Sequence, residues 1–353
     1  MNAFIEPDPA QLIFLRFEGN VRSRTTTFLP VNSGGLPRVK VVEVPPLKTL
    51  RKSFQTVKQL PRSATLLVAS PNSLIVVLLF VLRKQRPILD AGWPLIDGVI
   101  SSRRQFGFLG MRVVSTYLID LIAFHFSKLI FLESVEQVTY VRRSFLVNKR
   151  KLRLLFTGFD ESRVVKDLST KIHSSGSRVA TSVLFRGGNQ DEAGLVILNQ
   201  ALRALPKNHD FRFIIISRGF SSTLANNEYL RVIDKELSDL DLLREIEYCD
   251  VMLGQMSNHP RLKRTIPHKF FEAAFFGKPY VTSDFGLMEY FVKNKMVFGF
   301  TGGDPEALLR ELSTAISSPD EMSKRAARLH SWYADNASQK MLAKQFKDAI
   351  KET

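Results

Sequence analysis

Short apolar runs alternate with helical segments twice along this chain of 353 residues, and this alternation restricts the fold more than any other feature. Neighbouring parallel strands need a crossover connection, which a helix usually supplies. The pattern therefore predicts an α/β fold with doubly wound parallel sheets. In the first half, the expected strands are 11–19, 37–44, 64–70, 86–92, 128–134 and 151–160, and the expected helices are 20–31, 73–84, 135–145 and the first part of 115–132.

The same alternation restarts after a polar stretch at 161–177. We therefore expect two Rossmann-like domains, 1–162 and 163–335, with a C-terminal helix in 336–353 that crosses back to the first domain. Two successive open α/β sheets normally hold a ligand at the carboxyl ends of their strands, in a cleft that both domains face. In the second half, the expected strands are 178–188, 211–217 and 229–236, and the expected helices are 191–205, 239–249 and 304–317.

The composition is that of a folded protein in a reducing compartment. Apolar residues make up 44% of the chain and charged residues 24%, which is enough apolar material for two cores. The single cysteine, Cys249, excludes a disulfide framework, and its apolar surroundings predict a buried side chain. The polar start of the sequence has no basic segment before an apolar core, so we expect no signal peptide.

The net charge of +16 is concentrated in the first half. Residues 1–160 contain 23 Lys and Arg against 10 Asp and Glu, a net +13, whereas 161–353 contain 27 against 24, a net +3. This asymmetry indicates a polyanionic partner for the first half, either nucleic acid or anionic lipid. We expect no nucleic-acid partner, because no zinc-finger, RNP-like or helix-turn-helix pattern accompanies the charge.

The apolar segments of the first half favour a membrane surface as that partner. The run 73–82 is too short to span a bilayer, and charged residues interrupt 115–132. We expect instead that basic side chains meet anionic headgroups while neighbouring apolar ones dip into the interface. The expected membrane-contacting residues are Arg103, Arg104, Phe106, Phe108 and Leu109. Core helices with solvated basic ends are the alternative.

The stretch IPHKFFEAAFFGKPYVTSD, residues 266–284, places one acid in an apolar helical segment that ends at a Gly-Lys-Pro break. It resembles the signature of the large family 4 of GT-B glycosyltransferases, also called glycosyl transferases group 1. A Gly-rich turn after 178–188, an aspartate-initiated strand after 239–249 and the helix at 304–317 follow the order of that family. In the first half, RPILDAGWP and LRLLFTGFDE also resemble its segments.

The resemblance implies a GT-B fold, with an acceptor-binding N-terminal domain and a C-terminal domain that binds a nucleotide sugar. It also implies that Glu272 binds the ribose of the donor. Pro267 fits an early helix position, where the free N–H groups and Lys269 are expected to face a diphosphate. The alternative is an amphipathic helix on which Lys269 and Glu272 form an i,i+3 surface pair.

The sequence departs from the family at three positions. Arg264 stands where many members have a second glutamate, and Gly188 and Ala193 stand where they have an arginine and a lysine. The candidates for the missing charge are Arg186, Arg264 and Lys269. Gly187 and Gly188 are expected to let the backbone approach a phosphate, although a plain strand-to-helix turn explains them equally well. A divergent subgroup, an inverting relative of the polysaccharide glucuronosyltransferase kind and an inactive copy all remain open.

The sequence contains neither an Asp-x-Asp motif nor a His or Cys spacing typical of zinc, so we expect a reaction without metal or cofactor. An inverting reaction would need a base in the first domain. Asp90, at the end of the strand 86–92, is the first candidate, Asp97 the second and His125 the third. Capping or turn acids and a hydrogen-bonded helix histidine are the alternatives. A retaining reaction needs no such base.

The resemblance implies a glycosyltransferase of the hexosyltransferase type, and with the basic, apolar first half we expect a role in polysaccharide biosynthesis. The expected donor is a nucleotide sugar, most simply a UDP-sugar, and the expected acceptor is lipid-linked or a polysaccharide. The expected location is cytoplasmic, peripheral on the inner face of the plasma membrane. A GT-B-like partner subunit without activity is the second hypothesis, and a basic nucleic-acid-binding protein is the third. The sequence does not set the oligomeric state.

Overall fold

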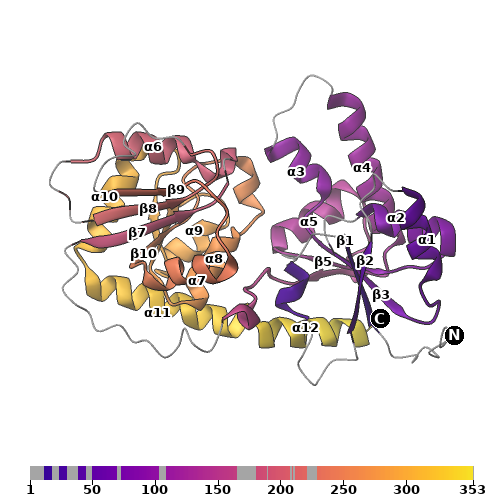
Figure 1. Ribbon diagram of the computed structural model, residues 1–353. Coiled ribbons are helices and arrows are strands. Elements are labelled where there is room, and N and C mark those ends of the chain that lie inside the picture. The colour runs from indigo at the N-terminus through magenta and orange to yellow at the C-terminus, as the bar shows by residue number, and fades with distance from the viewer. Residues whose placement is uncertain are drawn as a thin grey trace. The chain divides into compact units, whose positions relative to one another are not determined.

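The computed structural model describes residues 12–17, 24–29, 39–44, 50–69, 73–102, 109–164, 180–188, 190–206, 209, 211–220 and 229–352. The chain divides into two compact units (Figure 1). Unit 1 comprises Met1–Thr157 together with Gln339–Thr353, and unit 2 comprises Gly158–Ser338. The expected domain boundary lay at 162, a few residues beyond this division.

Unit 1 contains a parallel sheet with the strand order β2-β1-β3-β4-β5-β6. Its strands are β1 (Leu12–Phe17), β2 (Val39–Val44), β3 (Thr65–Ala69), β4 (Ile88–Gly92), β5 (Leu129–Leu132) and β6 (Leu152–Leu154). Its helices are α1 (Leu50–Gln59), α2 (Ser73–Arg83), α3 (Leu95–Ser102), α4 (Leu109–Phe126), α5 (Val135–Ser144) and α12 (Gln339–Lys351). Apolar residues point to both faces of this sheet and enter two separate cores, as expected for a parallel sheet with helices on both sides.

Helix α12 belongs to unit 1 although it is the last element of the chain. Its Phe346 side chain is fully buried, and its ring lies 4.9 Å from that of Phe28 and 5.2 Å from that of Phe131. Leu342 and Ala349 enter the same cluster from the same face of the helix. The C-terminal segment therefore completes the hydrophobic core of unit 1.

Unit 2 contains a second parallel sheet, with the order β12-β11-β10-β7-β8-β9. Its strands are β7 (Thr181–Arg186), β8 (Phe211–Ile216), β9 (Leu230–Ile233), β10 (Val251–Leu253), β11 (Tyr280–Ser283) and β12 (Phe298–Phe300). Its helices are α6 (Leu195–Arg203), α7 (Asp239–Tyr248), α8 (His268–Phe275), α9 (Met288–Lys293), α10 (Pro305–Ile316) and α11 (Pro319–Asn336). The chain starts at β7, extends the sheet outward to β9 and then continues at β10, on the other side of β7.

The α/β fold with two parallel sheets, predicted from the alternation, is confirmed. Cys249 is buried as expected, and burial raises the pKa of its thiol to about 12. The helix expected at 20–31 is wrong within the described residues, where only a 3-10 turn at Arg24–Thr27 forms. Three successive threonines explain this result, because β-branched side chains are weak helix formers and threonine hydroxyls bond to nearby backbone, as Thr27 does to the Arg24 carbonyl.

Candidate functional site

The lone acid of the 266–284 stretch lies inside a buried helix. Pro267 is the N-cap of α8, and all six residues from Lys269 to Ala274 are buried. A helix that is apolar on all sides belongs in a protein interior, so the phenylalanines around Glu272 are core residues. A carboxylate in such a place needs charged or hydrogen-bonding partners.

Arg186 and His268 are those partners. Arg186 Nε donates to Glu272 Oε2 at 2.6 Å, and Arg186 Nη2 donates to Oε1, which makes the pair bidentate. His268 Nδ1 lies 3.3 Å from Glu272 Oε1 and 3.1 Å from Arg186 Nη2. Burial by itself would raise the pKa of Glu272, but the charge of Arg186 and the hydrogen bond with His268 lower it to about 2. Glu272 is therefore ionised.

Lys269 lies differently from what the sequence predicted. Its Nζ donates to the Gly254 carbonyl at 2.8 Å and lies 4.0 Å from the centroid of the Phe185 ring. Burial lowers the pKa of this amine well below its ordinary value, and the nearby charge of Arg186 acts in the same direction. The surface pair with Glu272 is wrong, because both side chains are buried. In this arrangement Lys269 faces a carbonyl and a ring, and it ties α8 to the end of β10.

These residues meet where the strand order of the sheet reverses. Arg186 ends β7 and Gly254 follows β10, and these two strands are neighbours. Ligands of open α/β sheets bind at the carboxyl ends of the strands at such a point. Gly254 is required there, because a Cβ on it would lie 2.4 Å from Thr282 Oγ1 and 2.7 Å from the Tyr280 hydroxyl.

Gly187, the first glycine after β7, is hydrogen-bonded to the neighbouring strand β8. The Gly187 N–H donates to the Ile216 carbonyl at 3.0 Å and is therefore engaged by the neighbouring strand. Gly188 follows it outside the strand. That these two glycines let the backbone approach a phosphate stays a prediction. It applies to Gly188 more than to Gly187, because the Gly187 N–H already bonds to the Ile216 carbonyl.

An ion pair lies close to Ala193, one of the two positions at which family members have an arginine or a lysine. Next to Ala193, the Glu192 carboxylate receives a hydrogen bond from Arg261 Nη1 at 2.6 Å, and both side chains are largely buried. Gly194 has a φ of +73°, and a Cβ there would lie 2.8 Å from the Ser257 backbone nitrogen. Arg264 follows the 3-10 turn Pro260–Lys263, and its N–H donates to the Arg261 carbonyl. The side chain of Arg261, which the sequence did not single out, is thus a further cation at this end of the sheet.

The candidate bases of unit 1 are held by neighbours. Asp90 is fully buried; its Oδ1 receives a hydrogen bond from Arg24 Nε at 2.7 Å and its Oδ2 one from the Thr25 hydroxyl at 2.6 Å. Gln137 Nε2 donates to Asp97 Oδ2 at 3.0 Å. The carboxylate of Asp90 is therefore held by Arg24 and Thr25, and its role as a base stays a prediction.

The third candidate base, His125, lies on α4 with its Nε2 3.0 Å from the Phe145 carbonyl. This contact matches the alternative of a hydrogen-bonded helix histidine. It leaves the imidazole anchored to the segment after α5.

Asp120, which the sequence pattern marks only as an interruption of an apolar run, is a buried acid of unit 1. Its carboxylate receives hydrogen bonds from the Ile96 N–H at 2.9 Å and from the Ser73 hydroxyl at 3.1 Å. Burial raises its pKa to about 7, and the nearby charge of Asp97 acts in the same direction. The burial of Asp120 could have been expected from the sequence, because it is a single acid within a long apolar helix.

Most of the predicted membrane-contacting residues, Arg103, Arg104, Phe106 and Phe108, lie outside the described residues, and Leu109 is the first residue of α4. The helix that follows exposes an apolar stripe. Met111, Val114 and Leu118 are 76%, 56% and 46% exposed and recur at three- and four-residue steps on one face. Large side chains in this arrangement on one helix face are typical of an interaction surface.

Within the described ranges, no group of three or more His, Cys, Asp or Glu side chains is arranged to hold a metal ion. No helix in that part of the chain is long and apolar enough to cross a bilayer.

The structure is similar to solved structures along nearly its whole length. HepE from Anabaena, in complex with UDP-glucose, shares 14% identity over 97% of this chain and 100% of its own, with a TM-score of 0.71. Sucrose-phosphate synthase from Thermosynechococcus elongatus shares 12% over 97% and 98%, with a TM-score of 0.71. An α,α-trehalose-phosphate synthase (UDP-forming) from Burkholderia vietnamiensis shares 11% over 85% and 74%, with a TM-score of 0.60. No protein-family model matches the sequence, and no curated protein matches it by sequence.

The likeness to these structures identifies the fold of the chain as GT-B, the architecture that the 266–284 stretch had indicated. Because the identities are 14% or less, the likeness shows a shared fold only. The ligand of this chain has to be inferred from its own residues.

Proposed function

We propose that the protein is a glycosyltransferase of the hexosyltransferase type that uses a nucleotide sugar, a UDP-sugar in the first instance. The observation that carries this proposal is Glu272, an ionised carboxylate buried at the carboxyl end of β7 and β10. A carboxylate in this state accepts hydrogen bonds from vicinal ribose hydroxyls. The solved structure of HepE with UDP-glucose supports this choice of donor.

Arg186 has two places in the proposed reaction. Without donor, its guanidinium neutralises Glu272. When the donor binds, two ribose hydroxyls replace the guanidinium on Glu272, and Arg186 turns to the diphosphate. A planar guanidinium suits both partners, because it bonds carboxylate and phosphate in the same bidentate way. Together with the N–H groups at the start of α8, Arg186 would neutralise the leaving diphosphate without a metal ion.

Donor binding is tested by thermal shift with UDP- and GDP-sugars on the wild type, Glu272→Ala and Glu272→Gln. We expect a UDP-sugar to raise the melting temperature of the wild type and to have little effect on either variant. Glu306→Ala, which removes an exposed acid of α10 in the same unit, is the matched control. A donor that stabilises the Glu272 variants as strongly as the wild type contradicts the site assignment.

We propose further that unit 1 lies on an anionic membrane and presents a lipid-linked or polysaccharide acceptor, in polysaccharide biosynthesis at the cytoplasmic face of the plasma membrane. The excess of positive charge in residues 1–160 and the apolar stripe Met111, Val114 and Leu118 support this. An amphipathic helix with such a stripe lies in the headgroup region rather than across the bilayer.

Sedimentation with phosphatidylglycerol vesicles tests this surface. Met111→Asp with Leu118→Asp should lower vesicle binding by at least about tenfold, because two large apolar side chains leave the interface. Val196→Asp, on the exposed part of α6 in unit 2, is the control. Equal binding by the control and the double variant argues against the stripe as the contact.

A partner subunit without activity is the second candidate, favoured by Gly188 and Ala193 at the positions of the family's cationic pair. Such a subunit would bind the donor but show no turnover with any acceptor. Release of UDP from a UDP-sugar, measured with the membrane fraction as the source of acceptor, separates it from an active enzyme.

A further inference from the structure

His268, the first residue of α8, contacts both members of the Arg186–Glu272 pair. Its Nδ1 lies 3.1 Å from Arg186 Nη2 and 3.3 Å from Glu272 Oε1. The His268 side chain is 41% exposed and exchanges protons with water, whereas the Glu272 side chain is 2% exposed. The ring can therefore change its charge while the carboxylate beside it stays buried.

A single ring nitrogen cannot serve both contacts at the same time. Nδ1 without a proton accepts a hydrogen bond from Arg186, and Nδ1 with a proton donates one to Glu272. While Arg186 is in place, both forms of the ring have a partner. When Arg186 leaves, only Glu272 remains of the two, and a carboxylate selects the protonated nitrogen.

The departure of Arg186 also removes a positive charge from a buried place. Separating a buried ion pair leaves the remaining charge without a partner, which is strongly unfavourable. The ribose hydroxyls of the donor supply hydrogen bonds to Glu272, but they carry no charge. A second cation beside the carboxylate removes this cost.

Two other titratable side chains near Glu272 do not supply that cation. Lys269 lies on the same helix, but its Nζ is held by a backbone carbonyl, and burial lowers the pKa of this amine well below its ordinary value. Tyr280 of β11 is fully buried, and burial raises the pKa of its hydroxyl, so it stays neutral. Burial raises the pKa of Glu272 too, and the described side chains whose charge lowers it are Arg186 and His268.

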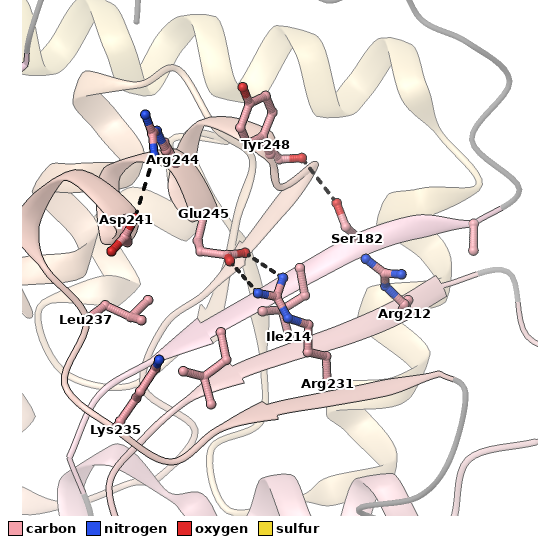
Figure 2. A pocket seen from close by; sticks show the side chains of 12 residues that line it. Ser182, Arg212, Ile214, Arg231, Lys235, Leu237, Asp241, Arg244, Glu245 and Tyr248 are labelled. Atoms are coloured by element: carbon pink, nitrogen blue, oxygen red, sulfur yellow. Dashed lines mark hydrogen bonds and ion pairs between the residues drawn. The ribbon is translucent and has the colours of Figure 1, made fainter.

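Another arginine–carboxylate pair of unit 2 shows the contrast (Figure 2). Arg231 donates to Glu245 through hydrogen bonds of 3.2 and 2.8 Å, and the Arg231 side chain is 51% exposed. The Glu245 side chain is 18% exposed, so water reaches it when Arg231 moves. The described residues that line the pocket of Figure 2 include no histidine. Of these two pairs, the buried one is accompanied by a titratable ring.

We propose that His268 takes up a proton when the donor binds, and that its imidazolium replaces Arg186 as the cation beside Glu272. This step rests on the proposed function, in which Arg186 turns to the diphosphate. The proton passes from the solvent to the imidazole, and no bond of the donor breaks. His268 acts through Glu272 and is a positioning residue, which keeps the carboxylate ionised and in place for two ribose hydroxyls. Donor binding is then stronger at low pH than at high pH.

Isothermal titration with UDP-glucose at about pH 6 and pH 8 tests the proton uptake, because this donor does not titrate in that range. The wild type should bind at least about threefold more tightly at the lower pH. In His268→Gln the amide can still donate to Glu272 but takes up no proton, so the affinity should be the same at both pH values. His330→Gln is the matched control. His330 also contacts α8, with its Nδ1 3.0 Å from the Ala274 carbonyl, and its variant should keep the wild-type pH dependence.

A second measurement needs no donor. NMR of the imidazole nitrogens, assigned by the signal that His268→Gln lacks, reports the protonation of His268. At pH 7 the doubly protonated fraction should be at least about twofold greater in Arg186→Ala than in the wild type, because the ring then faces Glu272 alone. Arg231→Ala, which opens the exposed pair, should leave this fraction unchanged.

The possible failures are distinguishable. Equal affinity of the wild type at both pH values, or a pH dependence that persists in His268→Gln, overturns the role of His268 and leaves the donor site in place. An unchanged ring in Arg186→Ala overturns that role as well. No binding of UDP-glucose to the wild type at either pH contradicts the proposed function itself, and the coupling to donor binding falls with it.

Discussion

An arginine–carboxylate pair lies at the sheet of each unit, Arg24–Asp90 in unit 1 and Arg186–Glu272 in unit 2, and these two pairs differ in their access to solvent. In unit 1, the side chains of Arg24 and Asp90 are 6% and 0% exposed. In unit 2, those of Arg186 and Glu272 are 23% and 2% exposed. The same chemical pair is therefore closed to solvent in one α/β unit and partly open to it in the other. In the closed pair both partners are held by further hydrogen bonds, whereas the more exposed Arg186 is the one that can exchange Glu272 for another anion, as the proposed function requires.

The surroundings of the two pairs support this distinction. Arg24 also donates to the Leu155 carbonyl at 2.8 Å, and the Thr25 hydroxyl bonds the other oxygen of Asp90, so that each partner is fixed twice. The only additional side chain on the Glu272 carboxylate among the described residues is His268, which is half-exposed. Releasing Arg186 therefore costs less than releasing Arg24 would.

The largest effect is expected from Arg24→Ala. It leaves the Asp90 carboxylate buried without its cation, which costs about 3–5 kcal/mol of unfolding free energy. In a Trp332→Phe background, Trp93 is the sole tryptophan and reports the urea unfolding of unit 1. Arg16→Ala, which opens a more exposed pair with Glu43 in the same sheet, is the control and should cost about 1 kcal/mol or less. Equal losses in both variants would show that burial does not make the Arg24–Asp90 pair more stabilising than an exposed pair of the same sheet.

Arg186→Ala should cost less, about 2 kcal/mol, since His268 remains and the site admits water. In a Trp93→Phe background, Trp332 reports on unit 2. The pKa of Glu272 is about 2 in the fold against an ordinary 4.5, so the pair contributes stability above pH 4.5 that is lost as the pH falls toward 2. In Arg186→Ala this loss of stability at low pH should be smaller. An unchanged loss would show that Arg186 does not set the pKa of Glu272.

Asp120→Asn should stabilise unit 1 at pH 8 by about 1–3 kcal/mol. The pKa of Asp120 is raised from 3.8 to about 7, so the folded state binds its proton more tightly than the unfolded state does. Wild-type stability therefore falls as the pH rises from about 4 to 7, and the variant, which does not titrate, should lack this fall. Urea unfolding of both proteins at pH 5 and pH 8, followed through Trp93, measures the difference. A variant less stable than the wild type at pH 8 would contradict the assignment.

Lys269→Met should have the smallest effect. Methionine fills a similar space, and the loss of the hydrogen bond to the Gly254 carbonyl costs about 1 kcal/mol. Titration with UDP compares this variant with Arg186→Ala. We expect Lys269→Met to bind UDP within about threefold of the wild type and Arg186→Ala to bind at least about tenfold more weakly. The reverse order would restore Lys269 as the group that faces the diphosphate.

Much of the fold was predictable because hydrophobic periodicity is local. The strand at 86–92, the helix at 239–249 and the helix around Glu272 all formed close to where the apolar pattern indicated. The residues after β1 were predicted less well, since threonines in series favour local hydrogen bonds over a helix. The orientation of Lys269 was not predictable either, because i,i+3 spacing alone does not tell whether a helix face meets solvent or a strand end.

By itself, the sequence determined that the chain forms two parallel sheets and that one carboxylate sits in an apolar helix at the end of a strand. Only the tertiary structure decided that Arg186, 86 residues away, neutralises that carboxylate, and that Lys269 turns inward to Gly254. The physical reason is that strand order decides which distant side chains become neighbours, and no local pattern of residues encodes that order.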